Sequence, residues 1–356
     1  MGARRVLFFI TMSRRNPMKR LSLLLLVVCL LLPAFALAEN PYPTIKFYSN
    51  NYVAAVGDTT YVKVTVSKAG SQTGTLELRN QRGEVLATKN YKSGTKEYNF
   101  SFTPVDSQEG GHNLSVWFGD VQVNANEGYL AITDRHRKVI QKIETDQPLM
   151  CITIDCAYVG GPTDKFLEIL DKYGIKCTFF MTGQFVEKFP EEAKKIAAAG
   201  HEIGNHSFSH PHMPDQNNLD SWAYQIRHTA EIIRENLGVN PRFFRPPFGE
   251  FNWKITVFAR SEGMETCLWT ADSHDWDTKF AKTPEKVIKR ITETKGDSRV
   301  DNGMIILFHL DGFNTPAILD EMIPRYQEMG YTLVTVSELC EAGGRVLPAL
   351  PEWAIQ

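Results

Sequence analysis

Apolar runs of strand length alternate with helix-length segments from about residue 148 onward, and this alternation limits the possible folds more than any other feature. The runs lie at residues 149–154, 176–180, 243–244, 265–269, 304–308 and 332–334. The segment from Pro190 to Gly200 begins with proline and ends with glycine, as helices commonly do. Repeated strand–helix units favour a parallel sheet covered by helices. Their number predicts an α/β domain whose sheet closes into a barrel.

Residue types that are common in catalytic sites follow strand-like segments of this region, including several of these runs. They are Asp155 and Cys156, His206 and His210, Arg245, Asp272 and Asp275, and His309. The carboxyl ends of the strands lie together in barrels of parallel strands, so we expect these side chains at one end of the barrel. Each also has an ordinary structural interpretation: Asp155 as a cap, Arg245 in a surface ion pair, the later aspartates as solvated loop residues and His309 as a satisfied buried histidine. Their common position favours a functional site.

His206 and His210 are four residues apart, just after an apolar run. On a helix or a tight turn, this spacing places both imidazoles on one face, where they can bind the same cation. An isolated pair of histidines at this spacing also occurs by chance. The assignment of a metal site therefore depends on the carboxylates, the arginine and the third histidine at the other strand ends.

Residues 39–133 contain short runs in which apolar and polar residues alternate. The runs are 45–48, 60–66, 75–78, 98–102 and 114–118. Such alternation is typical of half-buried strands, and several short strands with no helical pattern predict an immunoglobulin-like β-sandwich. This region has no catalytic cluster, which leaves spacing, contact with wall or glycan, or packing on the next domain as its role. We expect a linker at 134–147, the α/β domain at 148–345 and a tail at 346–356.

Residues 1–38 have the pattern of an export signal. A basic start at 18–20 precedes an unbroken apolar run at 21–32, and small residues at 36–38 fit cleavage after Ala38. The apolar run is short for a membrane span, and an uncleaved anchor is the alternative. The true start of the chain is expected at Met18. The pattern predicts a bacterial protein that is secreted or held at the cell surface, with no stable membrane span after cleavage.

The charge of the chain limits the classes of molecule that it can bind, and the positions of its cysteines indicate the role of the thiols. The formal net charge is -2, and no basic block follows the export signal, which argues against a nucleic-acid partner. Cysteines beyond the export signal have spacings that form no disulfide framework. Cys151, Cys177 and Cys267 lie in apolar runs, where a thiol commonly behaves as a small buried hydrophobe.

Five motifs between residues 148 and 340 resemble, in the same order, those of the polysaccharide deacetylase family, the NodB-homology carbohydrate esterases of family 4. They are Thr153-Ile154-Asp155-Cys156, His206-Ser207-Phe208-Ser209-His210, Arg245-Pro246-Pro247-Phe248, Asp272-Ser273-His274-Asp275-Trp276 and Leu307-Phe308-His309. The resemblance implies a deformed (β/α) barrel that removes acetyl groups from N-acetylated sugars and uses a divalent metal.

By position, the resemblance makes Asp155 the general base and His206 and His210 ligands of the metal. Arg245 would orient the base, and His309 would protonate the leaving amine. The chemistry of amide hydrolysis supports these roles. A bound metal lowers the pKa of water to about 7, and an amine leaves readily only when a positioned acid protonates it.

The remaining site residues follow from the same resemblance. Asp275 or Asp272 would hold and polarise the histidine that acts as the acid. The backbone N–H of Phe248 would help to bind the oxyanion, and Pro247 and Trp276 would line the sugar site.

Cys156 departs from the family pattern, which places a metal-binding aspartate at this position. A thiolate can bind zinc, and one cysteine with two histidines and a water is a known type of catalytic zinc site. We therefore expect Zn²⁺ as the metal, with Cys156 as its third ligand beside His206 and His210. The alternative is that Cys156 does not bind the metal and that the two histidines hold it weakly or not at all.

The resemblance and the export signal together predict an exported hydrolase that removes N-acetyl groups from N-acetylglucosamine units of a polysaccharide, with peptidoglycan as the expected polymer. One branch of the family acts on muramic acid, but the turn at 245–249 looks more like that of glucosamine-directed members. A muramic-acid deacetylase or an O-acetyl esterase is the alternative within the same chemistry. A glycan-binding pseudoenzyme with a degraded metal site is the alternative from another class.

Overall fold

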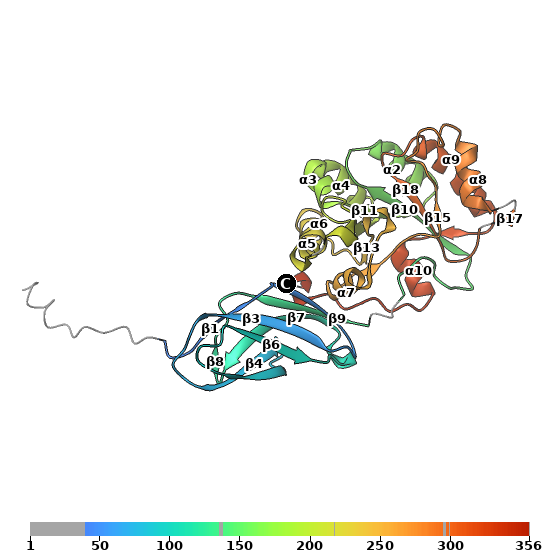
Figure 1. The fold of residues 1–356 in the computed structure, drawn as a ribbon. Helices are drawn as coiled ribbons and strands as arrows, with labels where there is room; N and C mark the ends of the chain where they lie inside the picture. The colour runs from blue at the N-terminus through green and yellow to red at the C-terminus, as the bar shows by residue number, and fades with distance from the viewer. Residues whose placement is uncertain (1–39, 135–137, 217, 295–296, 299, 356) are drawn as a thin grey trace, which may run out of the picture.

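An all-β domain precedes a barrel-like α/β domain along the chain (Figure 1). The computed structural model describes residues 40–355 except 135–137, 217, 295–296 and 299. The predicted export signal and its cleavage site therefore lie outside the described residues. None of the described helices combines the length and the apolar character that a membrane crossing requires.

Two sheets form the first domain. Its elements are β1 (Thr44–Phe47), β2 (Asn51–Ala55), β3 (Thr60–Lys68), β4 (Gly74–Asn80), β5 (Val85–Tyr91), β6 (Glu97–Phe102), η1 (Asp106–Gln108), β7 (Gly110–Phe118), β8 (Val121–Gln122) and β9 (Gly128–Thr133). One sheet has the order β1-β3-β6, and the other has the order β2-β9-β7-β4-β5 with β8 beside β7. Val62 and Phe100 of the first sheet share an apolar core with Leu78 and Val116 of the second. The two sheets thus pack face to face, as in a β-sandwich.

Strand β9 is buried along its whole length because its two faces pack against different domains. Leu130 faces the core of the sandwich. Tyr129 instead joins an apolar cluster with Phe258 of α7 (Trp253–Ser261) in the second domain. The guanidinium of Arg227 lies 4.0 Å from the centre of the Tyr129 ring. The sandwich is therefore packed against the second domain through one side of its larger sheet.

A parallel sheet forms the centre of the second domain. Its strands are β10 (Leu149–Cys156), β11 (Thr178–Met181), β12 (Glu202–Asn205), β13 (Phe243–Phe244), β14 (Glu265–Thr266), β15 (Ala271–Asp272), β18 (Met304–His309) and β19 (Thr332–Leu333). They follow the order β14-β13-β12-β11-β10-β18-β15, with β19 beside the start of β10. The stretch from β14 to β15 pairs with β13 at its beginning and with β18 at its end, so it joins the two edges. The sheet is curled in this way, and the predicted deformed (β/α) barrel is confirmed.

Helices cover the outside of this sheet and connect its strands (Figure 1). They are α2 (Thr163–Lys172), α3 (Gly183–Lys188), α4 (Pro190–Ala198), η2 (Met213–Asp215), α5 (Leu219–Ala223), η3 (Tyr224–His228), α6 (Thr229–Leu237), η4 (Pro247–Gly249), α7, α8 (Pro284–Thr292), α9 (Thr315–Glu328), α10 (Val336–Ala342) and α11 (Glu352–Ile355). A short hairpin, β16 (Glu293–Thr294) and β17 (Asp297–Ser298), follows α8.

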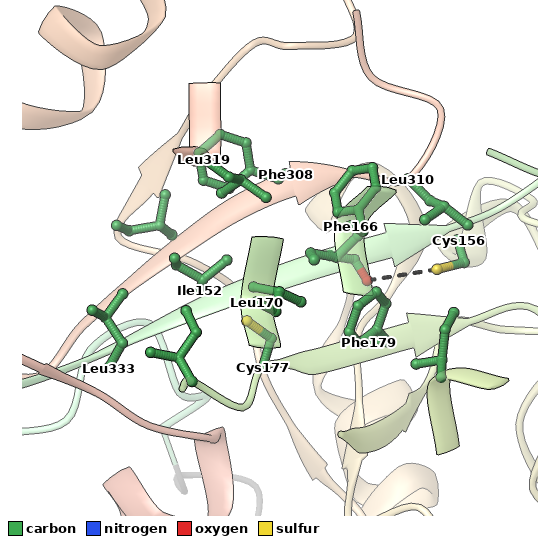
Figure 2. Packing of buried hydrophobic residues seen from close by; sticks show 14 of the residues in the cluster. Ile152, Cys156, Phe166, Leu170, Cys177, Phe179, Phe308, Leu310, Leu319 and Leu333 are labelled. Carbon is green, nitrogen blue, oxygen red and sulfur yellow. Dashed lines mark hydrogen bonds between the residues drawn. The ribbon is translucent and has the colours of Figure 1, made fainter. Parts of the chain in front are cut away.

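Two apolar layers lie on either side of the barrel sheet. Ile152 and Ile154 of β10 belong to the outer layer, which packs against helices α2 and α9 (Figure 2). Cys151 of the same strand belongs to the inner layer, together with Phe180 and Ile305. Successive side chains of a strand point to opposite faces. The odd-numbered residues of β10 therefore face the inside of the barrel.

The segments predicted as linker and tail both contribute to the packing. Ile140 and Ile143 are buried in the inner layer, and the N–H of Ile140 donates to the carbonyl of Thr266 at 2.9 Å. Near the C-terminus, Nε1 of Trp353 donates to Glu262 Oε2 at 3.0 Å. The second domain thus begins to pack before residue 148 and continues beyond 345.

The five cysteines of the described residues are buried and free. The expectation that Cys151, Cys177 and Cys267 act as small buried hydrophobes is therefore confirmed.

Candidate active site at the carboxyl end of the barrel strands

Asp155 and Arg245 form a buried ion pair at the carboxyl end of the barrel. Asp155 is on the inner face of β10, and Arg245 directly follows β13. Nη1 of Arg245 donates to Asp155 Oδ1 and to Thr153 Oγ1, each at 2.8 Å. Its Nε and Nη2 donate to the carbonyls of Cys267 and Leu268 at 3.2 and 2.9 Å. Arg245 is fully buried, so these bonds hold the guanidinium in one orientation.

The environment of Asp155 keeps its carboxylate ionised. Burial alone would raise the pKa of Asp155, but the charges of Arg245 and His309 outweigh burial, and the pKa lies below its usual value. A carboxylate that is ionised at neutral pH can accept a proton.

His206 follows β12 and points its free ring nitrogen towards Asp155. Its Nδ1 lies 2.8 Å from the carbonyl of Arg245. A carbonyl only accepts hydrogen bonds, so Nδ1 carries the proton and Nε2 keeps its lone pair. This Nε2 lies 3.4 Å from Asp155 Oδ2. Burial lowers the pKa of His206, which favours the neutral ring that metals bind.

His210 lies beside His206, with 4.8 Å between the ring centres. Its Nδ1 is 2.7 Å from Oη of Tyr158, and the same hydroxyl lies 3.5 Å from the carbonyl of His210. When the Tyr158 hydroxyl donates to that carbonyl and accepts from Nδ1–H, Nε2 of His210 is left with a free lone pair. Burial and the neighbouring His206 lower the pKa of His210 to about 3. The predicted histidine pair is thus brought together.

Tyr158 was missed by the sequence reasoning. It lies in the connection between β10 and α2. The only signal was an aromatic residue in the loop directly after a strand that carries an acid, which is too common a pattern to single out.

His309 faces Asp155 from the neighbouring strand. The two are paired in the register of β10 and β18, and side chains at paired positions of a sheet share a face. Asp275 holds His309 through Nδ1, which lies 2.7 Å from Oδ1, and through the backbone N–H, which donates to Oδ2 at 2.9 Å. Thr315 Oγ1 also donates to Asp275 Oδ2, at 2.6 Å. Burial disfavours the imidazolium, but Asp275 outweighs burial and raises the pKa of His309 to about 9.

Asp272 does not take part in this contact. Its Oδ1 accepts the backbone N–H of His274 at 2.8 Å, and its Oδ2 lies 3.6 Å from Nε2 of the same histidine. Of the two aspartates predicted from the sequence, Asp275 is therefore the partner of His309. Trp276 is more than half exposed next to His274, with 5.1 Å between the ring centres.

Phe248 projects from the turn after β13. Its ring is about half exposed and stacks on His212 with 4.3 Å between the ring centres, and it meets His210 edge to face at 4.6 Å. Pro247, the preceding residue, is buried and supports the turn without reaching the surface. Phe248 and Trp276 are thus placed to touch a bound molecule, whereas Pro247 is not.

Backbone strain is concentrated in the loops that carry the site. Five described residues other than glycine have positive φ: Ser207, His210, Phe248, His274 and Asn314. All five lie in loops that follow β12, β13, β15 or β18, at the same end of the barrel as Asp155. Such conformations cost free energy and commonly persist where function requires them.

Cys156 is on the opposite side of the sheet from Asp155. It lies in the outer apolar layer near Phe166, Phe179 and Leu310, fully buried (Figure 2). Strand β10 continues through residue 156, so consecutive residues point to opposite faces. Burial raises the pKa of the Cys156 thiol well above its usual value, which disfavours the thiolate that zinc requires. The predicted third ligand is not brought to the histidines.

The donor set falls one protein ligand short of a typical catalytic zinc site. Among the residues that the structure describes, no group of three histidine, cysteine, aspartate or glutamate side chains is placed to hold a metal ion. His206 and His210 offer two ring nitrogens, and the carboxylate nearest to them belongs to Asp155, which Arg245 already holds. Catalytic zinc sites commonly have three protein ligands. The residues present do not fit such a site.

Comparison with known proteins identifies relatives of the second domain. Residues 142–267 match the family model for polysaccharide deacetylase. The chain is 34% identical over 202 residues to a peptidoglycan-N-acetylmuramic acid deacetylase of Bacillus subtilis, covering 56% of this chain and 40% of that protein. It is 33% identical over 182 residues to a peptidoglycan-N-acetylglucosamine deacetylase of Bacillus cereus, covering 50% and 62%. The chain thus spans less than two thirds of the length of these curated relatives.

Solved structures similar to this chain include a deacetylase and a pseudoenzyme of the same family. A peptidoglycan N-acetylglucosamine deacetylase is 28% identical with a TM-score of 0.51, covering 59% of this chain and 94% of that one. A CE4 family pseudoenzyme from Bacillus anthracis is also 28% identical with a TM-score of 0.51, covering 61% and 73%.

Proposed function

Because this chain belongs to the polysaccharide deacetylase family, we propose that it removes N-acetyl groups from amino sugars of a polysaccharide, and that the polymer is peptidoglycan. One observation carries the proposal. Asp155 and His309 are paired across neighbouring strands, and their partners give them the opposite charge states that acid–base catalysis requires. Arg245 keeps Asp155 ionised, and Asp275 keeps His309 protonated.

The roles of the residues follow from those charge states. Asp155 accepts the proton of the water that attacks the acetyl carbonyl. His309 donates its proton to the nitrogen of the sugar as the carbon–nitrogen bond breaks, so that acetate and a free amine leave. Arg245 and Asp275 fix the positions of these two groups and make no contact with substrate. Phe248 and Trp276 offer aromatic faces to the sugar.

We propose N-acetylglucosamine as the sugar. The turn from Arg245 to Gly249 resembles that of glucosamine-directed members of the family, and the relatives include enzymes named for each sugar of peptidoglycan. Mass spectrometry of digested peptidoglycan after treatment with the protein would show which sugar loses an acetyl group. Loss from muramic acid alone would reject glucosamine as the target.

Acetate release tests the activity itself. Purified protein incubated with peptidoglycan and with chitin oligomers, in the presence of each of several divalent metals, is expected to release acetate. The Asp155→Asn and His309→Ala variants are expected to release none. Acetate release by Asp155→Asn at the rate of the natural protein would contradict the assignment of the base.

A glycan-binding protein with little or no turnover is the second candidate, and the position of Cys156 favours it. Among the described residues, the two histidines lack a third protein ligand, and one structural relative is a pseudoenzyme. Binding of chitin oligomers without acetate release, under every metal condition, would identify this candidate. We expect metal to bind His206 and His210 weakly, and we expect the His206→Ala variant to bind none.

We also propose that the protein is exported, because residues 1–38 have the pattern of a cleaved signal. Fractionation of the producing cells, followed by N-terminal sequencing of the mature protein, is expected to find Glu39 as the first residue. Protein that stays inside the cell with residues 1–38 intact would contradict the export.

A further inference from the structure

The outer face of the larger sandwich sheet is only partly covered by the barrel domain. On this face, Tyr129 of β9 packs against α7. Asn113 of β7 is paired with Tyr129. Trp117 of β7 and Arg79 of β4 lie further along the same face, because their neighbours Leu78 and Val116 point to the sandwich core. The part of this face around Trp117 therefore remains open.

A groove of about 430 Å³ lies on this open part of the face. The residues that line it include Arg79, Gln81, Asn113, Trp117, Gln122 and Glu127. This volume lies within the range of small-molecule binding sites. A planar aromatic ring surrounded by amides and one carboxylate suits sugars, since a sugar ring has apolar C–H faces and hydroxyl groups at its edges.

Trp117 and Arg79 are held in place before any ligand arrives. Nε1 of Trp117 donates to Ser115 Oγ at 2.8 Å. The guanidinium of Arg79 lies 5.0 Å from the centre of the Trp117 ring. Nε of Arg79 donates to Glu77 Oε2 at 2.8 Å, so the positive charge is paired. Preorganised groups lose little entropy on binding, which favours affinity.

Other polar groups in the groove are free to bind. Among the described residues, the side chains of Asn113 and Gln122 are exposed and have no hydrogen-bond partner, and Glu127 has none either. Arg79 is already paired with Glu77, so the groove has no unpaired cation to attract phosphate. The groove thus matches a neutral ligand rich in hydroxyl and amide groups.

The groove continues towards the barrel domain. A second hollow of about 190 Å³ shares Gln81 and Asn113 with it and is also lined by Arg227, Pro351 and Trp353. Two adjoining hollows that share lining residues, with a tryptophan in each, fit a chain of several sugar units better than a single small molecule.

We propose that the sandwich groove around Trp117 is a second glycan-binding site, which holds an N-acetylated polysaccharide chain apart from the site of Asp155 and His309. The choice of polymer rests on the proposed function. The groove increases the residence time of the protein on an insoluble polymer, because two sites on one molecule bind more tightly than either alone.

Binding to insoluble peptidoglycan tests this site. The measurement uses the full chain with Asp155→Asn, so that no acetyl group is removed during the assay. Trp117→Ala on this background is expected to raise the dissociation constant about tenfold. Tyr61→Ala, which removes an exposed tyrosine from the other sheet, is the matched control and is expected to leave it unchanged.

Equal binding by Trp117→Ala and by the control would overturn the proposal. If Trp117→Ala fails to fold by circular dichroism, a double variant of two exposed amides, Asn113→Ala with Gln122→Ala, replaces it and is expected to weaken binding at least threefold. The readout is independent of turnover. If the natural protein releases no acetate, the proposed function is rejected but the proposed glycan site in the groove is not. If Trp117→Ala binds peptidoglycan as tightly as the control, only the glycan site is rejected.

Discussion

Asp275 sets the charge state of His309, and this single contact makes stability depend on pH. The pKa of His309 is raised to about 9 in the folded protein, compared with about 6.5 in an unfolded chain. The folded state therefore binds more protons between these two pH values. The contribution is fully present below pH 6.5 and is lost as the pH rises through 9, and it amounts to about 3 kcal/mol.

Asp275→Asn is expected to remove this dependence. In the metal-free protein, the free energy of unfolding of the variant should change little between pH 6.5 and 9, and NMR titration should place the pKa of His309 below 7. Asp272→Asn is the control and is expected to lower the pKa of His309 far less, since Asp272 bonds His274 and acts on His309 only through its charge. An unchanged pKa of His309 in Asp275→Asn would show that another group holds the proton.

Cys156 gives a second prediction at this scale. Its thiol lies in the outer apolar layer, so Cys156→Ala is expected to leave the zinc affinity of the protein unchanged in equilibrium dialysis, whereas His206→Ala loses it. Cys156→Asp would bury a carboxylate in that layer and is expected to destabilise the protein by about 3 kcal/mol or more in urea unfolding. A loss of zinc binding in Cys156→Ala would place the thiol at the metal instead.

The sequence was informative about which residues meet and uninformative about which way Cys156 points. Asp155, His206, Arg245 and His309 each follow a strand of one parallel sheet, so their meeting could be predicted. The face of Cys156 depends on whether β10 ends before or after it, and strand ends cannot be read to one residue from an apolar run. A strand that ended at Asp155 would have released the thiol towards the histidines.

At the scale of elements, the loops at the carboxyl end of the barrel hold side chains at the site in conformations that reduce the stability of the fold. Phe248 lies in η4 with φ of 58° and ψ of 7°, a conformation that costs a residue other than glycine about 1 kcal/mol. Its ring is nevertheless half exposed and stacked on His212. The turn thus keeps an aromatic ring at the mouth of the site where a glycine would relieve the strain.

Phe248→Gly is expected to keep or raise the melting temperature, by up to about 2 °C, and to weaken the binding of chitin oligomers. The relief of strain is partly offset by the greater freedom of glycine in the unfolded chain. Phe251→Gly is the control, because Phe251 is exposed in the next loop without positive φ. A fall in melting temperature by 5 °C or more, as estimated for about 2 kcal/mol, would mean that the ring stabilises the fold more than the turn strains it.

The segment predicted as a linker shows why elements were easier to predict than their connections. Residues 134–147 are polar in composition, and polarity predicted a solvated linker. Two isoleucines in it, Ile140 and Ile143, nevertheless fill the inner layer of the barrel. Three apolar residues, Val139 and these two isoleucines, are too few in a polar segment of 14 residues to predict that it is packed.

The two domains behave as one packed unit at the scale of the whole molecule. Strand β9 belongs to the sandwich, yet Tyr129 contacts the barrel domain on three sides. Its ring meets Phe258 edge to face at 6.3 Å between ring centres, Arg227 covers it at 4.0 Å, and its hydroxyl donates to the carbonyl of Ser261 at 3.3 Å. An interface with a buried aromatic anchor holds domains in a fixed arrangement.

Tyr129→Ala and Tyr129→Phe together test whether this interface couples the unfolding of the two domains. The alanine variant opens a cavity between the domains and is expected to lower the free energy of unfolding by about 3 kcal/mol. The phenylalanine variant loses one hydrogen bond and should cost about 1 kcal/mol. In urea, we expect one cooperative transition for the natural protein and for Tyr129→Phe, and two separated transitions for Tyr129→Ala, because the weaker domain then unfolds without the other. Two transitions already in the natural protein would show that the domains unfold independently and that the orientation of the Trp117 groove towards the barrel is not fixed by Tyr129.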